Sequence, residues 1–250
     1  MFIFIFLYIE IHMLVVKNLK KSYGKREIIK DVSFEVKKGQ IFSILGPNGA
    51  GKTTCFYMIF GIVNPNSGKI FLNEHDITNV PIYMKSSLGI GYLPQESSIF
   101  QGLTTEENII AVLENFVKNK DERMAKLNEL INDFHLSHVR DSMSMSLSGG
   151  EKRRLEIARL LASDPDFILL DEPFAGVDPV STKDIIDIIK SLAAKNIGII
   201  ITDHNVREIM QCTDEMCIIY EGKILVQGQK EEILANDMVK KIYLGSDFKY

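Results

Sequence analysis

The sequence predicts an α/β fold with a mixed, mainly parallel sheet, an antiparallel β subdomain near its start and a helical subdomain inserted in its middle. From Met13 onward, short apolar runs alternate with helical stretches, the order that a largely parallel sheet requires. Between about residues 96 and 161 the strand pattern fades and helical apolar spacing takes its place. No internal repeat or Pro-rich linker separates the two parts, so we expect them to pack closely together.

The composition is that of a folded globular protein. The 250 residues are 46% hydrophobic and 25% charged, which is enough apolar material for a substantial core. The formal net charge is −4, so there is no global basic field and we expect no nucleic acid partner. Cys55, Cys212 and Cys217 lack the paired spacing of a zinc site or a disulfide framework, and we expect reduced, buried thiols.

The first twelve residues, MFIFIFLYIEIH, form an apolar leader that contains one acidic residue, Glu10. The run is too short to cross a bilayer, which takes about 20 apolar residues in a helix. It also lacks the basic start and the small-residue cleavage site of a secretory signal. We expect the leader to be a start-site artefact, with Met13 as the true first residue. An added edge strand and a weak contact with a membrane surface are the alternatives.

The expected elements follow in chain order. Segments 14–19 and 28–36 predict antiparallel strands at the start, and the apolar runs 41–45, 167–170 and 197–202 predict buried central strands. Helices are predicted over residues 54–60, 105–118 and 122–134. The three central strands matter most for chemistry, because a chemical motif follows each of them.

A phosphate-binding loop follows the first central strand. Residues 46–53, GPNGAGKT, fit G-x-x-x-x-G-K-[ST] between a strand and a helix, which is the context that this motif demands. Backbone N–H groups of the loop and the positive end of the helix are expected to face phosphate. Lys52 is expected to bridge the β- and γ-phosphates, and the Thr53 hydroxyl to coordinate Mg²⁺. The candidate nucleotide-binding residues here are Gly46, Pro47, Asn48, Gly49, Ala50, Gly51, Lys52, Thr53 and Thr54.

A second anion-binding helix start is predicted at LSGGE, residues 147–151. Ser148, Gly149, Gly150 and Glu151 precede the basic run 152–159, so the serine hydroxyl and glycine N–H groups can face another phosphate. A single chain does not need two separate binding sites for the same γ-phosphate. We therefore expect a symmetric head-to-tail homodimer, in which each ATP lies between one chain's phosphate loop and its partner's signature region. A plain N-cap followed by a glycine turn is the alternative.

With LSGGE downstream of a phosphate loop, the chain resembles the ABC ATPases, which are P-loop NTPases. The resemblance implies an ATP hydrolase that uses ATP and Mg²⁺. It implies that Asp171, at the end of FILLDE, holds Mg²⁺ and that Glu172 is the general base for the attacking water. His204 matches the switch histidine, which contacts the γ-phosphate. The implied catalytic residues are therefore Glu172, His204 and Lys52.

Three more residues match positions in the motifs of this family. Asp178 lies in GVD, which resembles the D-loop that communicates across the dimer. Gln95 matches the Q-loop glutamine, which senses Mg²⁺ and joins the core to the helical subdomain. Tyr23 matches the aromatic residue that stacks on adenine. His135 and His138 are three residues apart, but no Cys or carboxylate cluster completes a set, so we expect no metal there.

Within this family, segments 89–100, 171–179, 201–208 and 243–248 are similar to the ATPase subunits of lipopolysaccharide export (Lpt) systems. The similarity runs from about residue 13 to 250. It implies one ABC ATPase domain over 13–250, with the helical subdomain at about 96–161 and a C-terminal tail at about 231–250. It also implies a homodimer that drives two transmembrane permease subunits from the cytoplasmic face of the inner membrane, without direct contact with the transported lipid.

The membrane subunits are expected to dock in the groove beside Gln95, with Phe100 and Leu103 as apolar anchors. A Phe in a loop of small polar residues either packs inward or faces a partner, so an internal packing role for Phe100 is the alternative. Gln101 stands where the family commonly has Arg. This departure puts in doubt a charged contact with the membrane subunits, not the chemistry.

Two other functions remain open. The chain could be the ATPase of another ABC transporter, such as a branched-chain amino acid importer, which shares the core motifs. It could also be a soluble ABC protein that acts on DNA or ribosomes. Such proteins usually carry two ATPase halves, coiled-coil inserts or basic arms, and this acidic chain with a single core has none of them.

Overall fold

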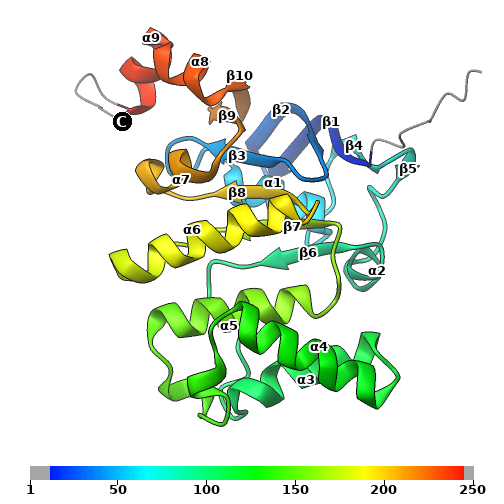
Figure 1. The fold of residues 1–250 in the computed structure, drawn as a ribbon. Coiled ribbons are helices and arrows are strands. Elements are labelled where there is room, and N and C mark those ends of the chain that lie inside the picture. Colours follow the sequence, from blue (N-terminus) through cyan, green and yellow to red (C-terminus); the bar gives the residue numbers. More distant parts are fainter. Residues whose placement is uncertain (1–11, 245–250) are drawn as a thin grey trace, which may run out of the picture.

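The computed structural model describes residues 12–244 of the chain (Figure 1). The predicted leader therefore lies outside the described residues except for His12, and so does the end of the predicted tail, 245–250. The described strands form one ten-stranded sheet in the order β5-β4-β1-β2-β10-β9-β3-β8-β7-β6. Its strands are β1 (Met13–Tyr23), β2 (Arg26–Lys37), β3 (Ile41–Leu45), β4 (Ser67–Leu72), β5 (His75–Asp76), β6 (Ile90–Leu93), β7 (Phe167–Asp171), β8 (Gly198–Thr202), β9 (Glu215–Tyr220) and β10 (Lys223–Gln229).

The helices lie mostly between the strands in sequence. They are α1 (Lys52–Phe60), α2 (Ile82–Ser87), α3 (Thr105–Phe116), α4 (Lys120–Asp133), α5 (Gly149–Leu161), α6 (Pro179–Ala194), α7 (Val206–Cys212), α8 (Lys230–Ala235) and α9 (Asp237–Val239). Short 3₁₀ turns cover Ser137–Val139 and Ser144–Ser146, and Lys240–Leu244 is a π-helical turn. Among the described residues, no helix is long and apolar enough to cross a membrane.

The predicted fold class is confirmed, and the predicted strands are present; β3 has the predicted bounds and the others have shifted ends. β1 and β2 run beyond 14–19 and 28–36, because they pair antiparallel as one hairpin as far as Tyr23 and Arg26. β4 pairs antiparallel with β1 on the other side. β7 extends to Asp171, which pairs with Thr202 at the end of β8.

The predicted helices also differ from the observed ones at their ends, and N-capping explains one shifted start and one start that is as predicted. The helix predicted over 122–134 begins earlier, at Lys120, because the Asn119 side chain accepts hydrogen bonds from the backbone N–H groups of Asp121 and Glu122. The helix predicted over 105–118 begins at Thr105, where the Thr104 side chain completes a capping box. It ends at Phe116, because Val117 adopts an extended conformation.

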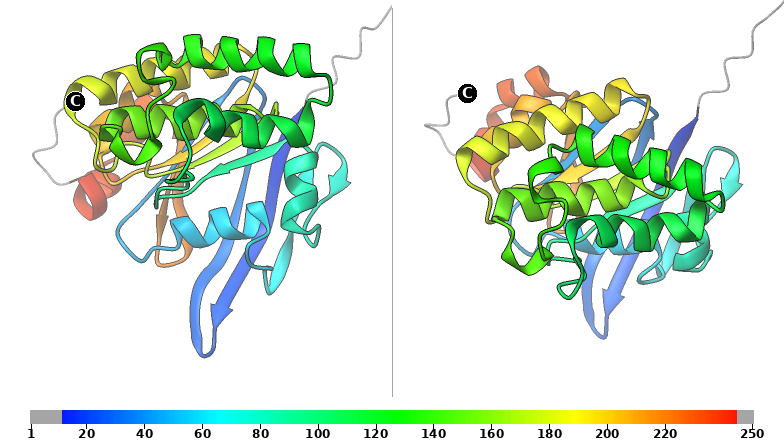
Figure 2. Two further views of the ribbon diagram at one scale, coloured as in Figure 1. Left: turned by 90° about the horizontal axis from the view of Figure 1, so that it is seen from below. Right: turned by 60° about the horizontal axis from the view of Figure 1, so that its bottom comes forward.

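The core strands β9, β3, β8, β7 and β6 pair parallel and are almost wholly buried. Successive side chains of β7 point to opposite faces. Phe167 and Leu169 join the apolar cluster that contains α1, whereas Ile168 and Leu170 join the cluster that contains α5 and α6. Figure 2 shows these helices on the two sides of the sheet. Because the strands are parallel, their carboxyl ends meet at one edge, where the loops after β3, β6, β7 and β8 come together.

All three cysteines are buried thiols, as predicted. Burial raises the pKa of Cys55 and of Cys212 to about 12. Burial also raises the pKa of Cys217 well above its ordinary value. The thiolate is the reactive form of cysteine, so these three side chains are chemically quiet under ordinary conditions.

Candidate functional site

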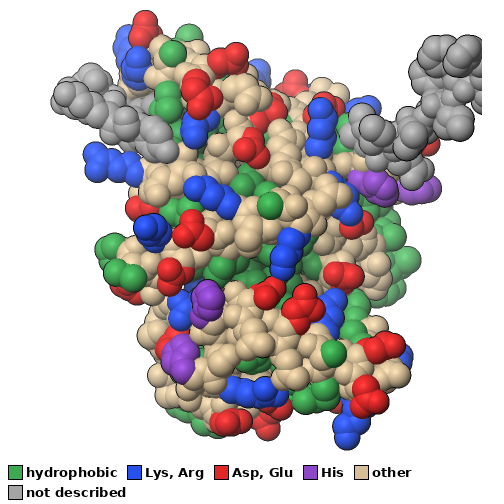
Figure 3. Space-filling model, in the orientation of Figure 1, with side chains coloured by type: hydrophobic (Ala, Val, Ile, Leu, Met, Phe, Trp, Pro, Cys, Tyr) green, Lys and Arg blue, Asp and Glu red, His purple; other side chains and the backbone are tan. Residues whose placement is uncertain are grey.

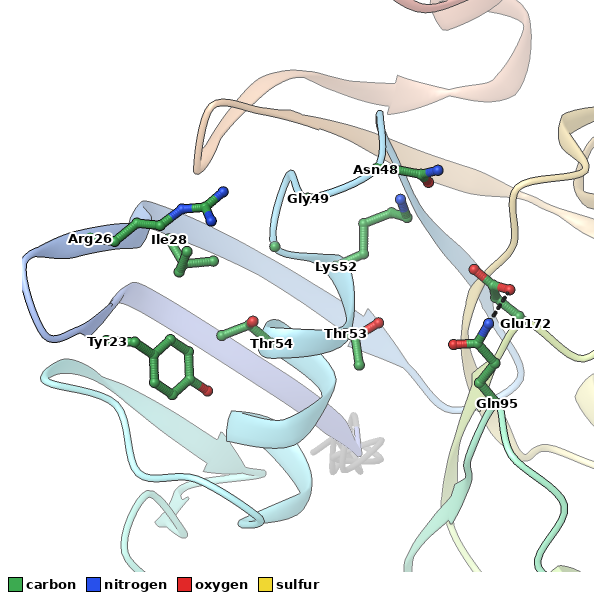
Figure 4. Close-up of a pocket in the computed structure, with 11 residues that line it drawn as sticks. Tyr23, Arg26, Ile28, Asn48, Gly49, Lys52, Thr53, Thr54, Gln95 and Glu172 are labelled. Carbon is green, nitrogen blue, oxygen red and sulfur yellow. Dashed lines mark hydrogen bonds between the residues drawn. The ribbon is translucent and has the colours of Figure 1, made fainter.

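A pocket of about 500 Å³ lies at the carboxyl edge of the parallel strands (Figure 4). The loop after β3 and the start of α1 form its floor, the hairpin of β1 and β2 forms one end, and the loops after β6 and β7 form the other. It is lined by Tyr23, Arg26, Ile28, Asn48, Gly49, Gly51, Lys52, Thr53, Thr54, Gln95 and Glu172. The pocket thus runs from an aromatic side chain, through a row of backbone N–H groups, to a carboxylate.

The loop between β3 and α1 requires glycine at two positions. Gly46 has φ +147°, and a Cβ there would lie 2.1 Å from the carbonyl oxygen of Ile219. Gly51, the N-cap of α1, has φ +107°, and a Cβ there would lie 2.3 Å from Cδ1 of Ile29. An alanine at either position would strain the backbone and collide with a neighbour. The glycines therefore let the loop curl closely over the sheet, with the positive end of α1 open toward the pocket.

Lys52 folds back over this loop. Its Nζ donates hydrogen bonds to the carbonyl oxygens of Gly46 at 2.8 Å and Pro47 at 3.2 Å. Burial lowers the pKa of Lys52, while the charges of Glu172, Asp171 and Asp203 oppose that shift. The ammonium group is thus held in the loop by two carbonyl oxygens and lies within the field of three carboxylates, beside the pocket.

Asp171 ends β7 beside the loop and is 1% exposed. Burial raises the pKa of its carboxyl to about 6, the charge of Glu172 acts in the same direction, and the Thr53 and Tyr92 hydroxyls oppose it. Among residues 12–244, its buried Oδ1 has no hydrogen-bond partner. An unpaired buried carboxylate oxygen near the Thr53 hydroxyl fits a hard divalent cation such as Mg²⁺. In the described part of the chain, no group of three or more His, Cys, Asp or Glu could hold a metal by itself.

Glu172 has the left-handed φ of +49°, which is uncommon for a residue with a side chain. Its N–H donates to the Thr202 carbonyl at 2.7 Å, and its Oε2 accepts a hydrogen bond from Nε2 of Gln95 at 2.8 Å (Figure 4). Nδ1 of His204 lies 3.4 Å from the same carboxylate oxygen and 3.3 Å from Oδ1 of Asp203. A carboxylate, an amide and an imidazole from three loops thus converge at one end of the pocket.

Comparison with known proteins decides what kind of pocket this is. Residues 29–175 match the family described as ABC transporter. The chain belongs to the ABC transporter family. A 52% identical relative is an uncharacterized ABC transporter ATP-binding protein of Rhizobium meliloti, matched over 94% of this chain and 87% of that protein. The lipopolysaccharide export system ATP-binding protein LptB of Haemophilus influenzae is 49% identical over 95% of this chain and 99% of that protein.

Solved structures agree with this assignment. An ATP-binding cassette of an ABC transporter matches with a TM-score of 0.85 and 29% identity, over 94% of this chain and 99% of that one. CbiO1 of Clostridium perfringens, part of the CbiONQ ABC transporter complex, matches with a TM-score of 0.84 and 28% identity, over 93% and 94% of the two chains. The chain is therefore an ATP-binding subunit of an ABC transporter and an ATP hydrolase.

The ABC signature lies apart from the pocket within one chain. Ser148 is the N-cap of α5, and it completes a capping box with Glu151. None of the four predicted signature residues lines the Lys52 pocket; Gly149 lines a smaller hollow with Gln95, Ser97, Lys152, Arg153, Glu156 and residues 175–177. A Cβ on Gly149 would lie 2.8 Å from the carbonyl oxygen of Gly176, so the signature packs closely against the predicted D-loop.

The other predicted site residues occupy separate positions. Ala50 is 5% exposed and packs into the apolar cluster of α1, so its side chain faces away from the pocket. Asp178 is the N-cap of α6, and its Oδ1 accepts hydrogen bonds from the N–H groups of Val180 and Ser181, both at 3.0 Å. Phe100 is 48% exposed, whereas Leu103 is half-buried.

Sequence reasoning missed Arg153, which joins the signature helix to the ATP pocket. The side chain is buried and donates to the carbonyls of Pro173 at 2.9 Å, Pro94 at 3.2 Å, Asp171 at 3.2 Å and Glu172 at 2.8 Å. It also pairs with Glu156 at 2.9 Å. Oε1 of Glu156 in turn accepts from Ser97 Oγ at 2.6 Å and Ser98 N at 3.0 Å. Only the fork of a guanidinium can serve so many acceptors at once.

Replacing Arg153 with Lys is expected to lower the free energy of unfolding by about 2 to 3 kcal/mol, because a lysine leaves several buried carbonyls unsatisfied. ATP hydrolysis should fall about tenfold as the backbone at Glu172 loosens. Urea denaturation and phosphate release measure the two effects. Arg123→Lys is the control, because Arg123 donates to one carbonyl, that of Val117. Equal stability of the two variants would contradict the importance of this network.

Arg26 and Ile28 are the other lining residues that the motifs did not indicate. Both lie on β2, where Arg26 is opposite Tyr23 of β1, and the hairpin brings them over the pocket (Figure 4). A basic residue at the end of an early strand is the signal that could have pointed to Arg26, but that pattern is common on exposed strands. The hairpin therefore adds a cation to the aromatic end of the pocket.

Proposed function

We propose that this chain is the ATPase subunit of a lipopolysaccharide export transporter. The observation that carries the proposal is its 49% identity with LptB proteins of Haemophilus influenzae and Escherichia coli over nearly the whole of both chains. That similarity extends past the ATP site, into segments that have no part in hydrolysis. We further infer a helical subdomain at about 96–161, which contains α3, α4 and α5, and a C-terminal tail at about 231–250.

The proposed working unit is a head-to-tail homodimer. The phosphate loop and Ser148 both present helix N-termini suited to phosphate, yet they do not share a pocket within one chain. A two-fold axis would bring the signature of one chain to the Lys52 pocket of its partner, and would do so twice. ATP binding would then close the dimer, and hydrolysis and phosphate release would open it.

The pocket residues have distinct proposed roles in hydrolysis. Lys52 neutralises charge on the β- and γ-phosphates, and the loop N–H groups orient them. Glu172 accepts the proton of the attacking water, and Gln95 holds the carboxylate in place at 2.8 Å. His204, whose Nδ1 lies 3.4 Å from the Glu172 carboxylate, contacts the γ-phosphate. Tyr23, which is 48% exposed at the far end, stacks on the adenine.

We also propose that Mg²⁺ binds with ATP between Thr53, Gln95 and Asp171. The unpaired buried Oδ1 of Asp171 supports this assignment, because such an oxygen is costly unless a cation or donor reaches it. Bound Mg²⁺ would offset the negative charge of the phosphate oxygens. The protein's own contribution is to hold two oxygens and an amide near one another, with the Asp171 carboxylate buried, where burial limits competition from water.

We propose that two permease subunits bind this chain at the surface around Phe100. The chain would then lie on the cytoplasmic face of the inner membrane. Asn108 is fully buried and holds the loop: its Oδ1 accepts from Phe100 N at 2.8 Å, and its Nδ2 donates to the carbonyls of Phe100, Leu103 and Thr104. The Arg159 guanidinium lies 4.4 Å from the Phe100 ring centroid. Because Asn108 holds the backbone of the loop while the Phe100 side chain stays 48% exposed, these contacts favour a Phe100 that faces a partner over one that packs inside the protein.

A second apolar surface lies on α2, where Ile82, Tyr83, Met84 and Leu88 are all more than 40% exposed. Figure 3 shows hydrophobic side chains gathered at the edge of the molecule where α2 lies. Exposed apolar clusters of this kind are typical of contact surfaces. We propose that α2 adds to the surface that receives the permease subunits, and that the transported lipid does not touch this chain.

Replacing Phe100 with Ala is expected to weaken assembly with the permease subunits about tenfold or more, because apolar anchors dominate the energy of such interfaces. ATP binding should be unchanged, since Phe100 does not line the ATP pocket. Co-purification from membranes measures assembly. Phe116→Ala is the matched control, because Phe116 is also half-exposed, at 41%, but lies at the end of α3. Unchanged co-purification of the Phe100 variant would remove this role.

Affinity purification of the native protein from detergent-solubilised membranes, with mass spectrometry of co-purifying proteins, tests the proposed function. Two membrane subunits with large periplasmic domains are the expected result. Recovery of permeases together with a periplasmic solute receptor would instead assign the chain to an importer, such as one for branched-chain amino acids. Recovery of ribosomal proteins or DNA would point to the non-transport class.

A further inference from the structure

His138 lies outside every motif that the proposed function uses, yet it contacts the signature. It stands in the 3₁₀ turn Ser137–Val139, and its Nε2 lies 2.9 Å from Oε1 of Glu151. The other oxygen of that carboxylate, Oε2, accepts hydrogen bonds from the Ser148 N–H at 2.8 Å and the Ser148 hydroxyl at 2.7 Å. Three polar side chains thus form a continuous chain from His138 through Glu151 to Ser148.

The direction of each hydrogen bond follows from the charge of Glu151. Hydrogen bonds from Ser148, and more weakly from His138, hold the pKa of Glu151 at about 2, so the carboxyl is ionised and accepts only. Nε2 of His138 must therefore carry a proton and donate it. The Ser148 hydroxyl has a single proton, which it donates to Glu151 while its oxygen accepts from the Glu151 N–H at 3.3 Å.

The position of His138 is fixed from two sides. The N–H of Val139 donates to the Leu136 carbonyl at 3.0 Å, and the N–H of Ser142 donates to the Val139 carbonyl at 3.0 Å. Arg140 pairs with Glu106 at the start of α3, and its Nη1 donates to Oδ1 of Asn128 at 2.8 Å. Arg140 therefore ties this turn to α3 and α4, and the backbone position from which His138 donates to Glu151 is well defined.

This arrangement matters when phosphate reaches the signature. A serine hydroxyl that donates to a partner's γ-phosphate has to turn away from Glu151, because it has only one proton to give. Glu151 would then lose one of its donors while a second anion approaches it. An ionised Glu151 carboxylate beside the phosphate would repel it. A hydrogen bond from His138 to Oε1 stabilises negative charge on that oxygen and so reduces the charge on Oε2, which faces Ser148.

We propose that His138 is a positioning residue of the ATP site in trans: its hydrogen bond holds Glu151 in place, so that Ser148 can turn its hydroxyl to the ATP bound by the partner chain. This inference rests on the proposed head-to-tail dimer. His138 does not contact ATP itself. It acts through Glu151, and its effect falls on closure of the dimer, not on nucleotide binding by the phosphate loop of its own chain.

Five variants of the full chain in a Glu172→Gln background test the proposal. ATP-driven dimerisation is followed by light scattering, and binding of a fluorescent ATP analogue is followed at protein concentrations where the chain is monomeric. His138→Leu is expected to raise the ATP concentration for half-dimerisation roughly threefold to fivefold, the scale of an exposed hydrogen bond to an ionised group. Monomer binding should not change. His138→Gln, whose amide can still donate to Glu151, should stay within about twofold of the parent.

Three further variants, His135→Asn, Glu151→Gln and the double variant Glu151→Gln/His138→Leu, separate positioning from a general loss of structure. His135→Asn is the matched control: His135 is exposed, lies three residues away and has φ +52°, a conformation that Asn tolerates. It should dimerise like the parent. In a Glu151→Gln background the carboxylate charge is absent, so His138→Leu should change the ATP concentration for half-dimerisation much less. A double-mutant cycle measures this coupling between His138 and Glu151.

The possible results are distinct. If the Glu172→Gln parent stays monomeric in excess ATP, the proposed dimer falls, and this inference falls with it. If the parent dimerises and His138→Leu dimerises equally well, the dimer stands and the role of His138 is overturned. An equal effect of His138→Leu with and without the Glu151 charge would likewise overturn it. Circular dichroism and thermal unfolding of His138→Leu and His138→Gln establish that both variants are folded.

Discussion

Replacing Glu172 with Gln is expected to lower the rate of ATP hydrolysis about a thousandfold while ATP stays bound. A general base contributes about 10²–10⁴ to rate, and an amide cannot accept the proton of the attacking water. The substitution keeps the size of the side chain, so the left-handed backbone, the bond to Thr202 and the contact with Gln95 can persist. Phosphate release measured at saturating ATP gives the rate, and filter binding gives nucleotide retention.

The same variant should accumulate as a closed dimer, because hydrolysis is the step that opens it. Size-exclusion chromatography in excess ATP is expected to show twice the monomer mass. Glu74→Gln is the control, because Glu74 is exposed near β5, away from the pocket, and should hydrolyse ATP like the parent chain. Hydrolysis near the parent rate would contradict the role of Glu172 as base, and a monomer in excess ATP would contradict the head-to-tail dimer.

Replacing Lys52 with Ala is expected to weaken ATP binding by about a hundredfold or more and to abolish measurable hydrolysis. The ammonium group lies within the loop, where burial strengthens its attraction to phosphate. Without it, the carboxylates of Asp171, Glu172 and Asp203 would face the phosphates with no side-chain cation of this loop between them. Titration calorimetry with ATP measures the loss directly.

Two comparisons make the Lys52 result interpretable. Lys69→Ala removes an exposed lysine that pairs with Asp76, far from the loop, and should leave ATP binding intact. Lys52→Arg keeps the charge but carries a larger head group, so it should retain more affinity than Lys52→Ala. Tight ATP binding by a folded Lys52→Ala chain would show that the loop N–H groups alone hold the phosphates, and would remove the proposed role of Lys52.

The central part of the pocket follows from the sequence because strand order and strand direction determine it. Lys52 and Glu172 follow two of the predicted central strands, and parallel strands bring their carboxyl ends to one edge of the sheet. Gln95 follows β6, a strand that was not predicted, so only the resemblance to the family indicated it. Their arrival in one pocket is a consequence of that topology. What each side chain does there stays a prediction that the two substitutions above address.

Other contacts could not be predicted, because they depend on how elements distant in sequence pack. The run 152–159 suggested a basic helix face, yet Arg153 and Arg154 are 5% and 8% exposed. Arg153 is buried because the ends of β6 and β7 present carbonyl groups to α5, and no spacing along α5 signals them. Arg26 likewise reaches the pocket only through the register of β1 and β2.

Several elements were missed for a similar reason. β9 has a buried apolar run, 216–219, like that of the central strands that were predicted. The strands β4, β5, β6 and β10 are short or only partly apolar, and their alternation is weak. They are stabilised by pairing with neighbours on the sheet instead of by a strong local pattern. The described part of the tail, α8 and α9, has no counterpart among the predicted helices, since each is shorter than two full turns.

The burial of all three cysteines has a practical consequence for watching this protein work. Because Cys55, Cys212 and Cys217 are enclosed and hard to ionise, a maleimide dye or spin label added to the native chain should leave them unmodified. One new cysteine on an exposed site would then be the sole attachment point, without a cysteine-less background. Pairs of such labels, one on each chain, would report opening and closing as a change in distance during turnover.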